Sequence, residues 1–206
     1  MTTGGDAPGA VSAHYENAAP GYSERRGRGV AGIVRRREQA AVLALTGARP
    51  GQWVLDVGCG DGEVAGLLLG RGAQVVAVDL ALAMANAARR RGAYALRADM
   101  RALPLRATFN EVMCIGSSEF VADLPGLAVG LAWCLRPGGS LVLLFPRRNW
   151  FGWALWLYHR LGGVRIRLRS RTAVTRALAG AGFAPPERWR RSLGAWVCRA
   201  RLAGGR

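Results

Sequence analysis

The chain has 206 residues, of which 50% are hydrophobic and 20% are charged, and its formal net charge is +16. This length and composition suit one α/β domain with a buried core, and they exclude a largely disordered or fibrous chain. No lysine occurs in the sequence, so arginine carries the positive charge. Such a chain attracts anionic ligands, although a codon bias toward arginine would give the same composition without a nucleic-acid partner.

Cysteine spacing and hydropathy indicate the cellular compartment of the protein. Cys59, Cys114, Cys134 and Cys198 have neither C-x-x-C nor Cys/His ligand spacing, which predicts reduced thiols and no metal site. No basic-then-apolar leader is present, and the apolar run at 150–158 is about half the roughly 20 residues that a membrane-spanning helix needs. We therefore predict a cytoplasmic protein.

Residues 1–47 are predicted to form a helical N-terminal extension that precedes the core of the domain at 48–206. Apolar residues recur at helical spacing through much of 14–46, after an irregular start that is broken at Pro20 and Gly21. The glycine-containing segment at 47–51 ends this helix.

Apolar, β-branched segments alternate with helical segments through the core. Strands are predicted at 53–57, 74–78, 94–98, 111–115 and 140–145, and helices are predicted after the glycine turn at 58–62, at 81–91 and at 124–135. Ser170 or Thr172 can cap a helix that runs to Ala181, and two further strands, near Trp189 and at 195–200, are expected to be antiparallel. This order predicts a single doubly wound α/β domain around a mostly parallel, seven-stranded sheet.

The first predicted strand ends in VLDVGCGDG, at the edge where open α/β sheets bind their ligands. Gly58, Gly60 and Gly62 let the backbone turn sharply and approach a ligand closely. Glu63 stands where the dinucleotide fingerprint G-x-G-x-x-G would place its third glycine, and Asp56 lies within the strand itself. An acid at Asp56 favours a ligand with a positively charged end over a pyrophosphate.

Two further carboxylates follow neighbouring strands. Asp79 comes about 20 residues after the glycine turn, where a carboxylate can bind both hydroxyls of a ribose. Asp99 follows the third strand and is placed to receive an exocyclic amine.

The motifs at 56–62, 79, 98–100 and 135–139, in this order, resemble those of class I S-adenosylmethionine-dependent methyltransferases of the small-molecule type. The resemblance implies a Rossmann-like fold, S-adenosylmethionine as the cofactor, and an N-terminal lid over it. The methionyl part of the cofactor would lie against the glycine turn, and the adenine near the third strand. The cofactor contacts that the resemblance implies are Tyr15, Tyr22, Asp56, Gly58, Cys59, Gly60, Asp79, Leu80, Asp99, Met100 and Ile115.

Methyl transfer is an in-line displacement, so much of its rate can come from holding the nucleophile near the methyl group, and a dedicated base is optional. Glu119 stands where the family often has a Glu-His pair, but Phe120 replaces the histidine, which disfavours metal-assisted and histidine-based variants. The only histidines are His14 and His159, and each could act as a base or simply pack in the fold. Glu119 and His14 are the candidate catalytic residues.

The stretch at 147–171 reads RRNWFGWALWLYHRLGGVRIRLRSR, and tryptophan beside arginine suits a lipid interface, stacked bases or a pocket for an apolar anion. We predict that about 147–169 is a substrate lid whose Arg148, Trp150 and Trp153 contact a small, apolar and acidic methyl acceptor. An amphipathic helix that packs on the sheet is the alternative, and a peripheral membrane contact is compatible with both.

The other function considered is an RNA-binding methyltransferase that uses the basic C-terminal third, from Arg160 onward. The Asn-Pro-Pro-Tyr or Asp-Pro-Pro-Tyr motif of many enzymes that methylate base amino groups is absent, and Ile115 to Ser118 stand in its place. Nucleic acid is therefore not the expected partner.

Overall fold

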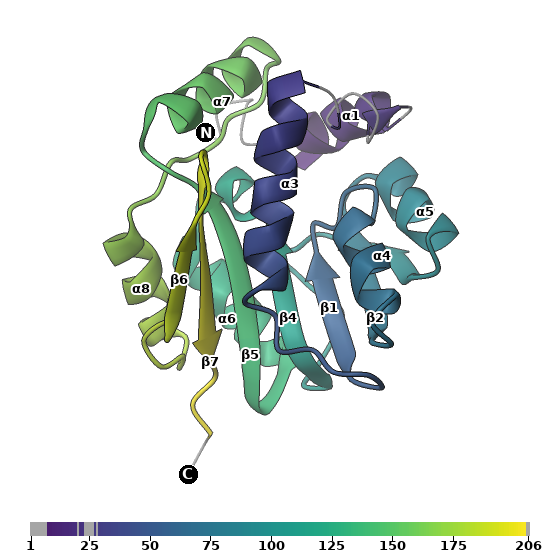
Figure 1. Ribbon diagram of the computed structural model, residues 1–206, viewed down its shortest axis with the longest axis vertical. Coiled ribbons are helices and arrows are strands. Elements are labelled where there is room, and N and C mark those ends of the chain that lie inside the picture. The colour runs from purple at the N-terminus through teal and green to yellow at the C-terminus, as the bar shows by residue number, and fades with distance from the viewer. Residues whose placement is uncertain (1–7, 20, 23–26, 28, 205–206) are drawn as a thin grey trace.

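A seven-stranded sheet forms the centre of the computed structural model, which describes residues 8–19, 21–22, 27 and 29–204 (Figure 1). Its strand order is β3-β2-β1-β4-β5-β7-β6, in which β1 to β5 are parallel and the last two strands are antiparallel to their neighbours. The strands are β1 (Trp53–Val57), β2 (Gln74–Asp79), β3 (Tyr94–Arg97), β4 (Phe109–Ile115), β5 (Leu135–Pro146), β6 (Arg188–Arg191) and β7 (Ala195–Arg201). The predicted doubly wound, mostly parallel sheet is confirmed.

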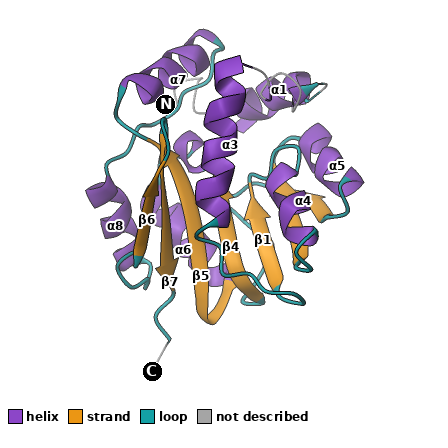
Figure 2. Cartoon of the chain, in the orientation of Figure 1, coloured by secondary structure: helices purple, strands orange, loops and turns teal. Residues whose placement is uncertain are grey.

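Helices cover both faces of the sheet, as Figure 2 shows. One layer consists of α3 (Gly29–Leu43), α4 (Glu63–Leu69) and α5 (Leu82–Arg90), and the other of α6 (Leu124–Cys134) and α8 (Arg171–Gly180). Each layer buries its own apolar cluster against the strands, with Val42 and Leu68 on the first face and Leu131 and Leu178 on the second. Burial on both faces explains why the central strands are almost continuously hydrophobic.

Two helices lie beyond the carboxyl ends of the parallel strands, α1 (Pro8–Ala18) and α7 (Trp150–Leu161), and the first half of α3 extends between them (Figure 1). Asn149 fixes the start of α7, because its Oδ1 accepts from the Gly152 N–H at 3.1 Å while its Nδ2 donates to the Leu193 carbonyl at 2.9 Å. No helix within the described part of the chain is long and apolar enough to cross a membrane.

The boundaries of several elements differ from those predicted. The first helix begins at Pro8 rather than near His14, and proline is favoured in the first turn of a helix. The expected break at Pro20 lies outside the described residues. Strand β5 begins at Leu135 rather than at Ser140, because Leu135 already pairs with Phe109 before the glycine turn. A short 3-10 helix at Ser118–Phe120, which was not predicted, follows β4.

A buried carboxylate anchors the end of α3 to the sheet. Glu111, which is 1% exposed, accepts hydrogen bonds from the Gly47 N–H at 2.8 Å, from Ser140 Oγ at 3.1 Å and from the Thr46 hydroxyl. Arg199 of β7 lies 3.7 Å from the same side chain. These contacts tie the segment after α3 to β4, β5 and β7, and so fix the position of α3 beside the strand ends.

Candidate functional site

A cavity of about 720 Å³ opens at the carboxyl ends of β1, β2 and β4, beneath α1, α3 and α7. Its position is the point at which the strand order reverses, between β1 and β4, where doubly wound sheets bind their ligands. The volume falls within the range of small-molecule sites, roughly 300–1,000 Å³. All of the predicted cofactor residues, Tyr15, Tyr22, Asp56, Gly58, Cys59, Gly60, Asp79, Leu80, Asp99, Met100 and Ile115, line this cavity.

The glycine turn after β1 forms one wall of the cavity. Gly58 and Gly62 have φ of 69° and 75°, and a Cβ at Gly62 would stand 2.5 Å from the Cα of Ala88 in α5. The N–H groups of Gly58 and Cys59 donate to the Val78 carbonyl at 2.8 and 3.0 Å. The turn therefore needs glycine both for its backbone conformation and for its close packing, as the sequence predicted.

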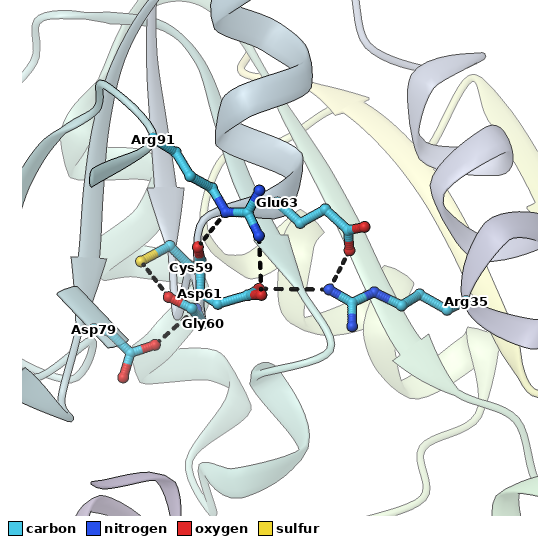
Figure 3. Close-up of polar contacts among 7 residues, drawn as sticks. All are labelled: Arg35, Cys59, Gly60, Asp61, Glu63, Asp79 and Arg91. Carbon is cyan, nitrogen blue, oxygen red and sulfur yellow. Dashed lines mark hydrogen bonds and ion pairs between the residues drawn. The ribbon is translucent and has the colours of Figure 1, made fainter. Parts of the chain in front are cut away.

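Asp79 stands at the end of β2, and two backbone N–H groups orient its carboxylate. Oδ2 accepts from Gly60 and Oδ1 accepts from Ala81, each at 2.9 Å (Figure 3 shows the Gly60 contact). Burial raises the pKa of Asp79 above its ordinary value, although the N–H groups of Ala81 and Gly60 oppose the rise. The carboxylate is thus held rigidly at the cavity wall, and each oxygen keeps acceptor capacity for a ligand hydroxyl.

Asp56 is a buried carboxylate with one oxygen that lacks a hydrogen-bond partner in the part of the chain that the structure describes. It is 1% exposed, and its Oδ2 accepts no hydrogen bond from the described residues. Burial, together with the charges of Asp79 and Asp61, raises the pKa of Asp56 to about 7. A cationic group bound in the cavity would supply the missing partner.

An arginine from α3 reaches the glycine turn, as Figure 3 shows. Arg35 forms ion pairs with Glu63 and, at 3.4 Å, with Asp61, which Arg91 also contacts at 3.4 Å. Asp61 and Glu63 are therefore both paired with arginine. Glu63 also lies in the first turn of α4, where the helix dipole favours an acidic side chain. Arg35 itself lines the cavity, and its Nη1 is buried and makes no hydrogen bond to the described residues.

No local pattern in the sequence points to Arg35 as a site residue. Arginine is the general basic residue of this chain, and residues 35–37 read Arg-Arg-Arg on an amphipathic helix. Only the packing of α3 beside the strand ends distinguishes Arg35, whose side chain is 11% exposed, from its exposed neighbours Arg36 and Arg37.

Asp99 occupies the opposite part of the cavity with an arginine partner of its own. Nε of Arg101 lies 3.0 Å from each oxygen of the Asp99 carboxylate. This hydrogen bonding lowers the pKa of Asp99 below its ordinary value. The carboxylate that was expected to receive an exocyclic amine is therefore already shared with a guanidinium group.

The N-terminal helix α1 covers the cavity and is joined to the core by a carboxylate. Glu16 accepts hydrogen bonds from the N–H groups of Leu82 and Ala83, at 2.5 and 3.0 Å, and so caps the first turn of α5 from another helix. Tyr15 packs edge-on against Tyr22 and against Phe120, with ring centroids 6.0 and 5.7 Å apart. These contacts hold the predicted lid tyrosines above the ends of the strands.

Both candidate catalytic residues line the same cavity, and a second histidine joins them. The rings of His14 and His159 lie 5.8 Å apart between centroids, and Phe120 packs edge-on against His159 at 5.4 Å. Glu119 is 3% exposed, and its main-chain carbonyl accepts from the Arg167 N–H at 2.9 Å. Helix α7 thus brings His159, which was not among the predicted catalytic residues, beside His14 from α1.

Arg148, Trp150 and Trp153 were predicted to line the site, and the structure places them elsewhere. None of the three is among the cavity-lining residues, and Trp150 is 82% exposed. The inward face of α7 instead presents Phe151, Ala154, Leu155, Tyr158 and His159. The aromatic residues of this run are chemically alike in the sequence. The contacts of Asn149 at the start of α7 fix the rotation of the helix about its axis, and every third or fourth residue therefore faces the cavity.

Residues 55–143 match the family model for a methyltransferase domain. By this match, the segment is identified as a methyltransferase domain. The seven-stranded sheet around this segment has the architecture expected of class I methyltransferases. The matched segment begins after α3 and ends before α7, so the walls contributed by these two helices and by α1 lie outside it.

Curated relatives and solved structures agree with this assignment. The chain is 34% identical over 135 residues to a malonyl-(acyl-carrier protein) O-methyltransferase of Enterobacter lignolyticus, with 64% of this chain and 51% of the relative covered. It is 36% identical over 124 residues to a ubiquinone biosynthesis O-methyltransferase of Xanthomonas oryzae pv. oryzae, with 56% and 50% covered. The chain therefore spans about half the length of each of these relatives.

Similarity of fold extends over nearly the whole chain. The magnesium protoporphyrin IX methyltransferase of Synechocystis, solved with bound S-adenosylhomocysteine, superposes with a TM-score of 0.75 at 19% identity, and the match covers 94% of this chain and 98% of that one. The likeness in fold therefore extends beyond the segment that the family model matches.

Proposed function

We propose that the protein transfers a methyl group from S-adenosylmethionine to an ionisable oxygen of a small, apolar acceptor. The observation that carries this proposal is that charged cofactor residues and an apolar wall line one cavity. At one end lie Asp56, Asp79 and Arg35, and between α1, α3 and α7 lie the apolar side chains Val11, Val34, Phe151, Ala154 and Leu155. The names of the two curated relatives, both O-methyltransferases, support oxygen as the acceptor atom.

The charged residues fit the cofactor group by group. Asp79 is suited to the two ribose hydroxyls, and the residues around Met100 to the adenine. The zwitterionic methionyl end would lie beside the glycine turn, with its ammonium group and the sulfonium near the uncompensated Asp56. Its carboxylate would take the buried Nη1 of Arg35 as a donor, so Arg35 and Asp56 would each gain a partner.

When bound, the cofactor supplies an electrophilic methyl group, and the residues of this chain orient the acceptor and receive its proton. His14 and His159 approach the same part of the cavity from α1 and α7, and either imidazole can accept a proton from an acceptor hydroxyl. Tyr15 packs edge-on against His14 and Tyr158 against His159, and Phe120 contacts both Tyr15 and His159.

The RNA-binding alternative receives no support from the cavity. Among the described residues that line it, the arginines are Arg35 and Arg101, and both are paired with acidic side chains. A channel for a nucleic-acid strand would combine unpaired basic side chains with exposed aromatic surfaces.

The activity can be tested by incubating the protein with methyl-labelled S-adenosylmethionine and fractionated small-molecule extracts. The proposal predicts label in an apolar, organic-soluble product whose methyl group is released by ether or ester cleavage. Label that appears only in RNA, or on nitrogen or carbon of a product, would contradict it. Omission of the extract controls for self-methylation of the protein.

Arg35→Gln is expected to weaken the binding of S-adenosylmethionine by roughly tenfold to a hundredfold, since it removes a charge-assisted hydrogen bond. Binding of methylthioadenosine, which has the ribose and adenine but no methionyl carboxylate, should change much less. Isothermal titration of both ligands measures the difference, and Arg36→Gln, an exposed neighbour on α3, is the matched control. Equal losses for both ligands would show that Arg35 only supports the fold of the turn.

His159→Gln is expected to lower kcat by about 10²-fold, near the lower end of the effect of losing a general base, because His14 remains beside it. His14→Gln and Glu119→Gln should cost no more than this. Steady-state kinetics as a function of pH provide the measurement, together with cofactor affinity, which should stay unchanged. Loss of all turnover in a single variant with intact cofactor binding would identify an obligatory base.

A further inference from the structure

The outward face of α7 carries large apolar side chains that the described protein does not cover. Trp150, Trp153, Leu157 and Leu161 are 82%, 49%, 51% and 80% exposed. Their spacing of three or four residues places them on one face of the helix. Figure 1 shows α7 at the outer end of the molecule, beyond the carboxyl ends of the strands.

The segment that contains this face carries charge of one sign. No Asp or Glu occurs in the sequence between Asp123 and Glu187, a segment that contains the whole of α7. Arg148 and Arg160, one near each end of the helix, are both exposed. Together with the formal net charge of +16, this arrangement is complementary to a negatively charged surface.

The apolar face continues to the mouth of the cavity. Val30 of α3 and Tyr158 and Phe151 of α7 line the cavity, yet they are 67%, 64% and 39% exposed. Helix α7 therefore presents an apolar side to the exterior and another to the cavity. A molecule that leaves an apolar phase next to α7 would meet these apolar side chains as it enters the cavity.

We propose that the outward face of α7 docks on the surface of an anionic phospholipid bilayer. Tryptophan and leucine would enter the boundary between headgroups and acyl chains, and the flanking arginines would bind the phosphate groups, as in interfacial amphipathic helices. The helix has 12 residues and would lie parallel to the bilayer rather than cross it.

Two other occupants fit the face less well. A second copy of this chain would bring a second net charge of +16 against the first. The phosphates of a nucleic acid could pair with the exposed arginines. Its bases would gain little from Leu157 and Leu161, because aliphatic side chains offer no stacking surface. A bilayer uses both the apolar and the basic parts of the surface.

Co-sedimentation with vesicles tests the proposal without any methyl acceptor. The protein should sediment with vesicles of phosphatidylcholine and phosphatidylglycerol, and much less with vesicles of phosphatidylcholine alone. Raising the salt concentration should weaken the binding, because exposed charges are screened. The double variant Trp150→Ser/Trp153→Ser should bind anionic vesicles at least tenfold more weakly than the unmodified protein.

Trp133→Ser is the matched control, because Trp133 is 62% exposed but lies on α6, on a face of the sheet away from α7. This variant should bind vesicles as the unmodified protein does, and all variants should retain cofactor affinity, which separates this test from that of the methyltransferase reaction. Equal vesicle binding by the double variant and the Trp133 variant would overturn the proposal. So would the absence of binding to anionic vesicles, or a dimer in sedimentation velocity that the double variant abolishes.

Discussion

Replacement of Asp79 by alanine is expected to weaken the binding of S-adenosylmethionine by about 3–6 kcal/mol, or roughly 10²- to 10⁴-fold in Kd. The carboxylate is proposed to accept one hydrogen bond from each ribose hydroxyl, and a hydrogen bond to a charged group contributes about 1.5–3 kcal/mol. The variant also loses the acceptor that orients the Gly60 N–H in the glycine turn. Isothermal titration with S-adenosylmethionine measures the change.

Methylthioadenosine distinguishes the role of Asp79 from that of the methionyl contacts. This ligand keeps the ribose, so Asp79→Ala should weaken its binding by a similar factor, in contrast to Arg35→Gln. Asp79→Asn retains the size of the side chain and one acceptor oxygen, and should lose less affinity than the alanine variant. Unchanged affinity of Asp79→Ala for both ligands would show that the ribose does not bind at the end of β2.

The part of the cavity that we propose for the cofactor was predictable, because its residues follow local rules. A carboxylate at the end of a strand, such as Asp79, faces the ligand edge of a parallel sheet wherever the strands are correctly recognised. The glycine turn is equally local, since its positive φ angles and its contact with α5 demand glycine. The cap of α8 was also predicted, and Ser170 Oγ accepts from the Ala173 N–H at 3.1 Å.

The part that we propose for the methyl acceptor was not predictable in the same way, because it depends on how helices distant in sequence pack together. The neighbours Trp150 and Phe151 have similar chemistry, yet one faces the exterior and the other the cavity. That choice follows from the contact of Asn149 with the turn at Leu193, which lies over 40 residues away in the chain. The meeting of His14 and His159 is likewise a consequence of tertiary packing.

The irregular pairing at the start of β5 shows the same limit within the sheet. Pro137 and the two glycines after it mark a turn, and the sequence therefore placed the strand after them. In the structure Leu135 pairs with Phe109 before the turn, and the pairing resumes between Glu111 and Ser140. A long-range pairing of this kind leaves no periodic pattern around the turn itself.

The second large effect concerns Asp56 and the stability of the cofactor-free protein. Burial raises its pKa to about 7, whereas an unfolded chain would have a value near 3.9. Its contribution to folding is therefore fully present below about pH 3.9 and is lost as the pH rises through 7, at a cost of at most about 4 kcal/mol. Asp56→Asn should accordingly raise the melting temperature of the free protein at pH 8, and should change it little at pH 4.

Cofactor binding should show the opposite dependence on pH. A bound sulfonium and ammonium favour the ionised carboxylate, so the pKa of Asp56 falls on binding, and the association constant should rise up to tenfold per pH unit below pH 7 and level off above it. Titrations near pH 6 in two buffers of different ionisation enthalpy should detect a released proton, which Asp56→Asn should abolish together with most of the affinity. Methylthioadenosine carries neither cation, so its affinity should not follow this titration. If the affinity of S-adenosylmethionine were independent of pH between 6 and 8 while Asp56→Asn bound it normally, the cationic end of the cofactor would not lie at Asp56.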